Sequence, residues 1–260
     1  LYSRFFTKAL RDLNYIRLDE PFKGLFTQGM VTHKTFMNSN NEWVEPSNVI
    51  QENEKLLDRK GNSVKSGSIE KMSKSKKNVI DPTEIIELYG ADTARWFMLS
   101  DSPPERDLEW TEKGVAASYK FINKIWEIGL KSLSYKSDRS TDEAFNHDSF
   151  DQIINEIALN IESFHFNKSV AKIYEYVNLL SSAISSRCIG EKELYKAIKN
   201  LAIIIHPFIP HISEEVWSKI GCSGLSACAA WPITKQEFSK NIIKMPIQIN
   251  GKTKSLIDII

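Results

Sequence analysis

Between residues 111 and 220 the hydrophobic residues recur every three or four positions, which is the spacing of one face of an α-helix. A first stripe begins at Val115 and ends at Leu130. Four more stripes follow, made of Phe150, Ile153, Ile154, Ile157, Ala158 and Ile161; of Val170, Ile173, Tyr174, Val177, Leu180 and Ile184; of Leu194, Ile198, Leu201, Ala202 and Ile205; and of Ile212, Val216, Trp217 and Ile220. Such stripes predict helices packed as a bundle. Residues 131–147 lack this period and are expected to form a linker.

The pattern before residue 70 is more varied. Residues 1–13 place their apolar side chains on one helical face, which predicts a surface helix packed on a core. Residues 25–31 read as a buried strand that contains Gly29. A glycine within a strand often marks a close approach by backbone or by a ligand, and simple packing is the equal alternative. Residues 38–66 are polar and irregular and are expected to form an insertion, with a short strand near Trp43 and a turn at Pro46.

Helix start and stop signals are clear in the middle of the chain. Pro82 predicts the first turn of a helix capped by Asp81 or Thr83, and Gly90 predicts its end. A second short helix is expected over residues 91–99. Two consecutive prolines then forbid a helix, so that residues 102–110 are expected to be extended.

Residues 245–249 and 254–260 flank an Asn-Gly pair, a strong signal for a β-hairpin. This hairpin reaches the last residue, and the first residue is Leu1 rather than methionine. We therefore expect the chain to be a piece of a longer protein.

Composition narrows the class of protein. The 260 residues carry a net charge of +1, 42% are hydrophobic and 26% are charged, as in globular domains, and no apolar run approaches the roughly 20 residues of a membrane span. Three cysteines favour a reducing cytoplasm over a disulfide framework. His206 and His211 lie near Cys222 and Cys228, but their spacing matches no zinc motif, so no protein-bound metal is predicted.

Positive charge is concentrated in one stretch. From Lys55 to Lys77 there are eight lysines and arginines against two carboxylates. The glycines and serines of residues 61–68 predict a mobile loop ahead of Lys71-Met72-Ser73-Lys74-Ser75. Such a patch attracts phosphate, although a solvated lysine-rich loop is the usual alternative.

The order of residues 71–75, K-M-S-K-S, followed by N-V-I-D-P, resembles the signature loop of class I aminoacyl-tRNA synthetases. The resemblance implies a loop that closes over ATP while an amino acid carboxylate attacks the α-phosphate. Lysine ammonium groups then stabilise the departing pyrophosphate.

Further stretches resemble the bacterial leucyl-tRNA synthetases. These are residues 1–10, 25–31, 90–95, 206–217 and 248–252, and above all the proline–acid run at 102–110, which the isoleucine, valine and methionine enzymes do not share. The family's other ATP motif, H-I-G-H, is absent from this sequence. The resemblance therefore implies a C-terminal fragment that is inactive alone, with the leucine pocket and editing domain upstream.

The resemblance assigns Lys71 and Lys74 as the phosphate-facing, catalytic lysines. It implies ATP binding, with Mg²⁺, by residues 71–75, that is Lys71, Met72, Ser73, Lys74 and Ser75, and by Gln28 and Gly29 near the adenosine. Lys77 stands where many relatives carry glycine. Asn123 and Lys124 on the first bundle helix, with Arg106, are candidate tRNA contacts. A solvated helix face is the alternative for Asn123 and Lys124.

The expected fold is mainly α with a partial α/β region, a remnant of a Rossmann-like catalytic domain followed by a helix-bundle anticodon-binding domain. The expected domains are residues 1–66 (end of the catalytic domain, with the insertion), 67–110 (signature loop and connecting stem-contact fold), 111–240 (anticodon-binding bundle) and 241–260 (start of a further domain). The implied partners are tRNA(Leu), ATP and leucine, in a cytoplasmic monomer. Two alternatives stay open: a valyl-, isoleucyl- or methionyl-type enzyme, and a stand-alone tRNA-binding module.

Overall fold

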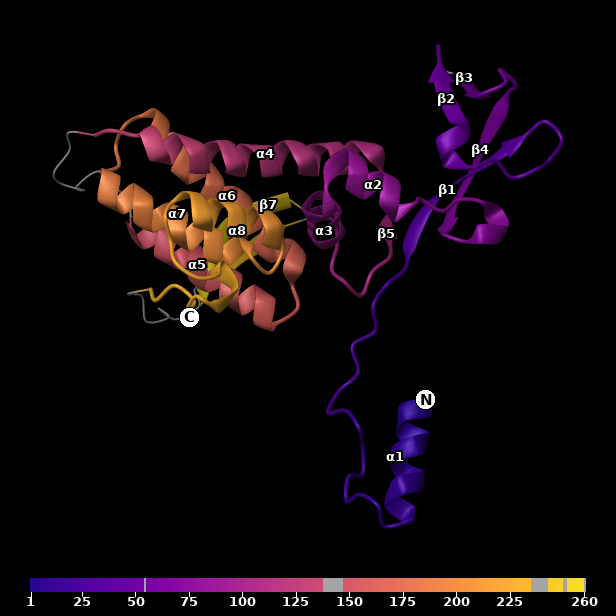
Figure 1. The fold of residues 1–260 in the computed structure, drawn as a ribbon, viewed down its shortest axis with the longest axis horizontal. Helices are drawn as coiled ribbons and strands as arrows, with labels where there is room; N and C mark the ends of the chain where they lie inside the picture. Colours follow the sequence, from indigo (N-terminus) through magenta and orange to yellow (C-terminus); the bar gives the residue numbers. More distant parts are fainter. Residues whose placement is uncertain (54, 138–146, 235–242, 250–251, 260) are drawn as a thin grey trace.

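The computed structural model describes residues 1–53, 55–137, 147–234, 243–249 and 252–259. Most of the described chain is helical, and a small sheet stands beside the helices (Figure 1). None of the described helices combines the length and the apolar character that crossing a membrane would need.

The helices of the second half form the predicted bundle. They are α4 (Glu112–Ser134), α5 (His147–Glu162), α6 (Phe166–Ser185), α7 (Glu191–Ile205) and α8 (Pro210–Lys219). Their apolar stripes meet in one core, in which Ile125, Ile157 and Ile173 have no exposed surface. Helix α4 continues to Ser134, four residues into the predicted linker, and residues 138–146 of that linker lie outside the described residues.

The small sheet has the strand order β4-β1-β5, formed by β1 (Val31–Asn38), β4 (Val64–Lys71) and β5 (Leu108–Glu109). Strand β4 is antiparallel to β1, and β5 is parallel to it. The prediction of a mobile loop over residues 61–68 was therefore wrong. Backbone pairing with β1 outweighs the turn-forming tendency of the glycines and serines.

Residues 38–66 are also more regular than predicted. The short 3-10 helix η1 (Pro46–Asn48) makes the turn expected at Pro46, and β2 (Val49–Glu52) pairs with β3 (Lys55–Asp58). The strand expected near Trp43 is reduced to a single bridge to Met37. This part projects from the sheet, away from the bundle (Figure 1).

Two short helices, α2 (Pro82–Tyr89) and α3 (Ala91–Ser100), lie between the sheet and the bundle (Figure 1). The predicted signals hold: the Asp81 carboxylate accepts from the Thr83 N–H at 2.8 Å, and Gly90 ends α2 with φ 82°. Trp96 of α3 is fully buried in the bundle core. Phe97 of α3 instead joins a second cluster with Leu108, Trp110 and Val115.

Two polar side chains of α3 fasten it to the corner between α7 and α8. The Asp92 carboxylate accepts from the Ile212 N–H at 2.7 Å and lies 3.0 Å from Nδ1 of His211. The Arg95 guanidinium donates to the carbonyls of Phe208 and Pro207 at 2.9 and 2.8 Å. Asp92 thereby caps the N-terminus of α8, so the connecting helices and the bundle are joined by hydrogen bonds as well as by apolar packing.

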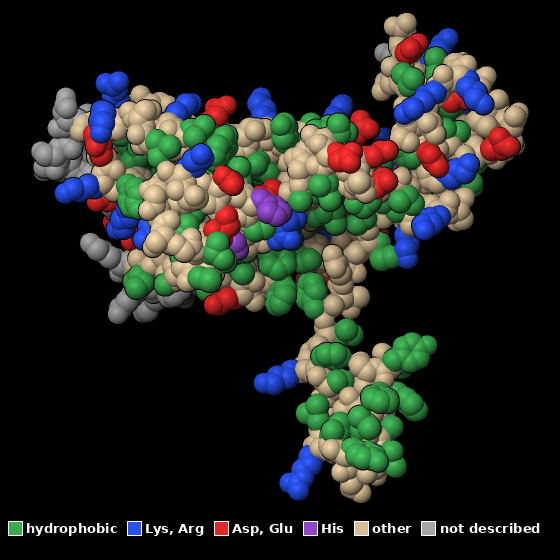
Figure 2. Space-filling model, in the orientation of Figure 1, with side chains coloured by type: hydrophobic (Ala, Val, Ile, Leu, Met, Phe, Trp, Pro, Cys, Tyr) green, Lys and Arg blue, Asp and Glu red, His purple; other side chains and the backbone are tan. Residues whose placement is uncertain are grey.

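Helix α1 (Tyr2–Asp12) forms as predicted, but its apolar face is not packed on a core. It lies apart from the rest of the chain (Figure 1), and Figure 2 shows hydrophobic side chains gathered over it. Residues 25–30 are likewise not the predicted buried strand: Leu25 is 92% exposed, and the strand begins only at Val31. Within the described residues the apolar surface of this region has no core to enter.

The C-terminal hairpin is confirmed at the level of the backbone. Strand β6 (Ile243–Ile249) pairs antiparallel with β7 (Lys252–Ile259). The Asn-Gly pair that predicted the turn lies outside the described residues.

Candidate functional site

Residues 71–77, called the basic segment below, start from a fixed base. Lys71 is the last residue of β4 and stands opposite Thr32 of β1. The next residue, Met72, donates its N–H to the Val31 carbonyl at 3.1 Å, and its side chain packs against the Phe97 cluster. The first two residues of the segment thus belong to the sheet and its apolar support.

Beyond Met72 the segment turns sharply. Ser73 caps the 3-10 helix η2 (Lys74–Lys76), and its hydroxyl accepts from the Lys76 N–H at 3.4 Å. Lys77 ends this turn in the left-handed region with φ 54°. That conformation suits glycine better than lysine, because a side chain is strained in the left-handed region.

Asn78 lies directly behind the basic segment and has no exposed surface. Its Oδ1 accepts from the Ser73 N–H at 2.9 Å. Its Nδ2, which carries two hydrogens, lies within hydrogen-bond distance of three carbonyls, those of His33 and Glu70 at 3.2 Å and that of Lys71 at 3.3 Å, and shares one hydrogen between two of them. One buried side chain therefore joins strand β1, the end of β4 and the start of the turn.

The side chain of Lys76 points back over the sheet. Its ammonium pairs with the Glu70 carboxylate and lies 5.9 Å from the centre of the Trp43 ring. Hydrogen bonds from Lys76 and then from Ser68 hold the pKa of Glu70 below its ordinary value, so this carboxylate stays charged at neutral pH. The pair fixes one end of the turn to strand β4 of the sheet.

Lys71 and Lys74 differ from Lys76. Both are exposed, and within the described part of the chain neither forms an ion pair. Exposed ammonium groups on a turn with an anchored base can meet a phosphate group without first breaking a protein contact. Ser75 is also exposed, and its hydroxyl lies 3.3 Å from that of Ser73.

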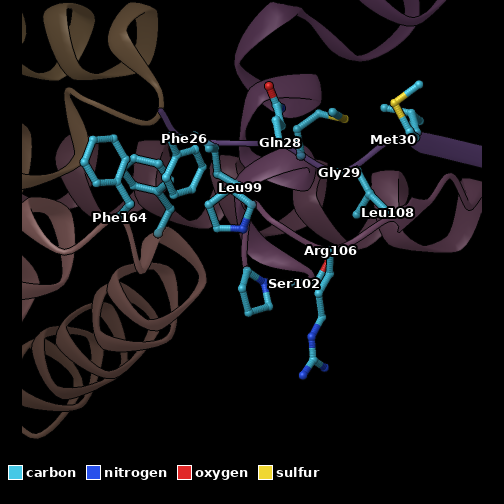
Figure 3. A pocket seen from close by; sticks show the side chains of 14 residues that line it. Phe26, Gln28, Gly29, Met30, Leu99, Ser102, Arg106, Leu108 and Phe164 are labelled. Atoms are coloured by element: carbon cyan, nitrogen blue, oxygen red, sulfur yellow. The ribbon is translucent and has the colours of Figure 1, made fainter. Parts of the chain in front are cut away.

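Gln28 and Gly29 line a cavity of about 250 Å³ together with Arg106 (Figure 3). The Gly29 N–H donates to the Pro104 carbonyl at 2.8 Å, and a Cβ at Gly29 would lie 2.0 Å from the carbonyl oxygen of Arg106. The cavity also holds a stack of Phe26 on Phe164, with ring centres 5.0 Å apart. Gly29 is therefore required for close packing against the proline–acid turn, which is the close backbone approach that a glycine in this stretch can indicate.

The same cavity does not include the basic segment. Residues 71–75 are absent from its lining, whereas a neighbouring apolar cavity of about 270 Å³ is lined by Met72. Val31 and Met98 line both cavities. The guanidinium of Arg106 points away from the other labelled side chains of Figure 3. Gln28, Gly29 and Arg106 are thus brought together in one cavity, and neither Lys71 nor Lys74 lines it.

Asn123 and Lys124 lie elsewhere, in a groove of about 790 Å³ between α4 and α6. Lys124 donates to the Asn178 Oδ1 at 2.8 Å, and Asn123 donates to the Tyr119 carbonyl of its own helix at 3.0 Å. Lys120 and Lys131 line the same groove, with Glu127 as its acidic member. The groove presents positive charge on an open surface, which suits a phosphate backbone.

His206 and His211 make hydrogen bonds at the bundle corner. Nδ1 of His206 lies 3.0 Å from the Ser226 hydroxyl, and His211 contacts Asp92. The Cys222 thiol lies 3.3 Å from the hydroxyl of Tyr195. Among the described residues no three His, Cys, Asp or Glu side chains are grouped as a metal would require.

Two family descriptions match parts of the chain. The anticodon-binding domain of tRNA ligase matches residues 147–260. The class I tRNA synthetases of the I, L, M and V types match residues 62–111, which include the basic segment and its support.

Relatives match the chain over its whole length. Leucine--tRNA ligase of Allorhizobium ampelinum is 39% identical and covers 100% of the chain, which spans 32% of that relative. Leucine--tRNA ligase of Chelativorans sp. is 41% identical over 98% of the chain, which spans 31% of it. The chain therefore spans about a third of the length of the curated relatives it matches.

A solved structure has the same arrangement of elements. The crystal structure of the ternary complex of Agrobacterium radiobacter K84 agnB2 LeuRS with tRNA and LeuAMS superposes with a TM-score of 0.67 at 29% identity. It covers 99% of this chain, which corresponds to 30% of that structure's chain.

Proposed function

We propose that the chain is a C-terminal part of a leucine–tRNA ligase, because it is homologous to these enzymes along its whole length. The parent reaction joins leucine and ATP to leucyl-adenylate and pyrophosphate, and then transfers leucine to tRNA(Leu). The single observation that supports this most is the identity of about 40% to these ligases across the chain, with K-M-S-K-S on an exposed turn.

In this proposal Lys71 and Lys74 face the leaving pyrophosphate of MgATP, which is bound as the substrate. Negative charge builds on the leaving group in the transition state. Two ammonium groups that contact it there lower the barrier without strengthening the binding of ATP in the ground state. Met72 contributes through its packing, which holds the base of the segment in place. Ser73 and Ser75 supply the hydroxyls of the turn.

Gln28 and Gly29 are assigned more indirectly. Their contacts with residues 104–106 support a role in shaping the edge of the ATP site, in addition to the proposed contact near the adenosine. The sheet β4-β1-β5 would then be the remnant of a Rossmann-like catalytic domain. The leucine pocket and the second ATP motif would lie in the part of the relatives that this chain does not match.

The helical part is proposed to dock tRNA(Leu). The groove that holds Asn123 and Lys124 and the free guanidinium of Arg106 are the proposed contacts. The Agrobacterium radiobacter ternary complex contains tRNA, which shows tRNA binding for that LeuRS and supports by similarity the tRNA docking proposed for this chain. The proposed domains are residues 1–66, 67–110, 111–240 and 241–260, in a monomer that works in the cytoplasm.

The test is the Lys74→Ala variant of the full-length chain that contains these residues. Removing one charge-stabilising contact should slow leucine-dependent ATP–pyrophosphate exchange by about 10²–10³-fold, with little change in the affinity for tRNA(Leu). Lys60→Ala, which removes an exposed lysine from the turn between β3 and β4, serves as the matched control and should leave exchange unchanged.

Two results would contradict the proposal. If Lys74→Ala left exchange intact but abolished tRNA binding, the basic segment would be an RNA-binding element. If valine, isoleucine or methionine supported exchange better than leucine, the parent would be another class I enzyme. The 260-residue chain alone, without the H-I-G-H motif, is expected to show no leucine-dependent exchange.

A further inference from the structure

We propose that Asn78 is the positioning residue of the basic segment, and that it acts chiefly on Lys74. This inference rests on the proposed function, because it concerns the same phosphate-facing lysines. The inference goes beyond the proposed function because it names a residue outside the K-M-S-K-S motif that sets the position of these lysines.

The first argument is the burial of Asn78. A buried amide that loses its hydrogen-bond partners is destabilising, because its polar atoms are then shielded from water and left unpaired. Asn78 has no exposed surface, and its four contacts reach His33, Glu70, Lys71 and Ser73. Two of these partners, the Lys71 carbonyl and the Ser73 N–H, lie on either side of Met72. The turn therefore cannot leave the sheet at this point without stranding part of a buried amide.

The second argument is that the two catalytic lysines are held differently. Lys71 is part of β4, so pairing with β1 fixes its backbone whatever happens to Asn78. Lys74 follows Ser73, whose N–H is bonded to Asn78 and not to the strand ladder. Loss of the Asn78 side chain should therefore release the backbone that carries Lys74 and leave that of Lys71 in place.

The third argument concerns what such release would do to the reaction. A charged group stabilises a transition state only when it is held where the charge develops, and a misplacement of about 1 Å can cost roughly 10²-fold in rate. A freed Lys74 would occupy many positions around the turn. The ion pair of Lys76 with Glu70 would restrain the far end of the turn but not its start.

The experiment uses the Asn78→Ala variant of the full-length chain. We expect kcat for leucine-dependent ATP–pyrophosphate exchange to fall by about 10–100-fold, with KM for leucine unchanged. Transfer of leucine from preformed leucyl-adenylate to tRNA should proceed at the normal rate, because pyrophosphate has already left. Asn62→Ala is the matched control, since Asn62 bonds Asp58 in the turn before β4 and does not contact the basic segment.

A double-mutant cycle tests the route of the effect. If Asn78 acts through Lys74, the Asn78→Ala substitution should cost little in a Lys74→Ala background. Full additivity of the two losses would overturn the proposal. So would an equal loss of exchange, transfer and tRNA binding, which is the result that a purely structural residue predicts. If Asn78→Ala does not accumulate as folded protein, Asn78→Ser is measured by the same criteria.

Hydrogen exchange separates this inference from the function on which it rests. The Ser73 amide should exchange at least about tenfold faster in Asn78→Ala than in the parent, since its acceptor is gone. A Ser73 amide that exchanges at the parental rate would overturn the positioning role even in an active leucine enzyme. If the parent enzyme showed no leucine-dependent ATP–pyrophosphate exchange, the proposed function would be refuted instead. Faster hydrogen exchange of the Ser73 amide in the Asn78→Ala variant of that parent would still support the positioning role of Asn78.

Discussion

Lys77 occupies a backbone conformation that glycine adopts more easily. Its φ of 54° lies in the left-handed region, where a side chain costs about 1–2 kcal/mol and glycine costs little. Glycine also loses more backbone freedom on folding, which offsets part of this gain. Lysine at the end of the turn is therefore somewhat less favourable than glycine would be.

The corresponding prediction concerns stability. Lys77→Gly should raise the free energy of unfolding by up to about 1 kcal/mol, and Lys77→Val should lower it by about 1–2 kcal/mol, because a β-branched residue fits positive φ poorly. Urea denaturation of the chain measures both. Lys60→Gly makes the same change where φ is not positive and should not stabilise. A stabilisation of equal size at Lys60 would show that the effect is not one of backbone conformation.

At the same scale, sequence reasoning identified the candidate lysines but not what holds them. The order K-M-S-K-S is specific because it is a local motif. The contacts of Asn78 with His33 and of Lys76 with Trp43 join residues far apart in the sequence, with a separation of 45 for the first pair. No periodicity or spacing reports such pairs. The one available signal was an asparagine directly after a basic turn and ahead of the apolar residues Val79 and Ile80.

At the scale of elements, predictions held where the cause was local. Helix α2 begins and ends where Pro82, Asp81 and Gly90 indicate, and the bundle stripes became helices with buried faces. Strand β4 was missed because its serines and glycine suit a loop, and only the partner strand β1 makes it a strand. The resemblance to leucyl-tRNA synthetases, which rested on motif order, is confirmed by the relatives.

The joint between α3 and α8 gives a prediction at this scale. Asp92→Ala should lower the free energy of unfolding by about 1–3 kcal/mol, because it removes a helix cap and leaves the Ile212 N–H without its acceptor. Asp101→Ala, at the exposed C-terminal end of α3, is the control and should change stability by less than about 0.5 kcal/mol. Chemical denaturation followed by tryptophan fluorescence compares the two, with Trp96 on the same helix. Equal losses would mean that the cap does not contribute to the joint.

At the scale of the whole molecule, the buried surface is distributed unevenly. The bundle and the Phe97 cluster contain nearly all of the described buried apolar side chains, whereas Leu1, Tyr2 and Phe5 at the start of α1 are exposed. The sequence predicted the amphipathic helix, since periodicity requires only the residues of the helix itself. The sequence did not predict that the apolar face of α1 lacks a packing partner within the described residues. An apolar stripe indicates that a helix face is suited to packing, but it does not indicate which residues pack against it. The relatives are about three times longer than the chain, so they have residues that can cover this face.

A matched pair of substitutions tests this distribution. Phe5 is 72% exposed on α1, and Phe121 is 6% exposed in the bundle core. Phe121→Ala should lower the free energy of unfolding of the 260-residue chain by about 3–5 kcal/mol, and Phe5→Ala should change it by less than about 0.5 kcal/mol. In the full-length chain Phe5→Ala should cost considerably more, because there the face of α1 would be packed. Denaturation of both proteins measures the four values, and a Phe5→Ala cost that is equally small in the full-length chain would show that α1 packs on nothing.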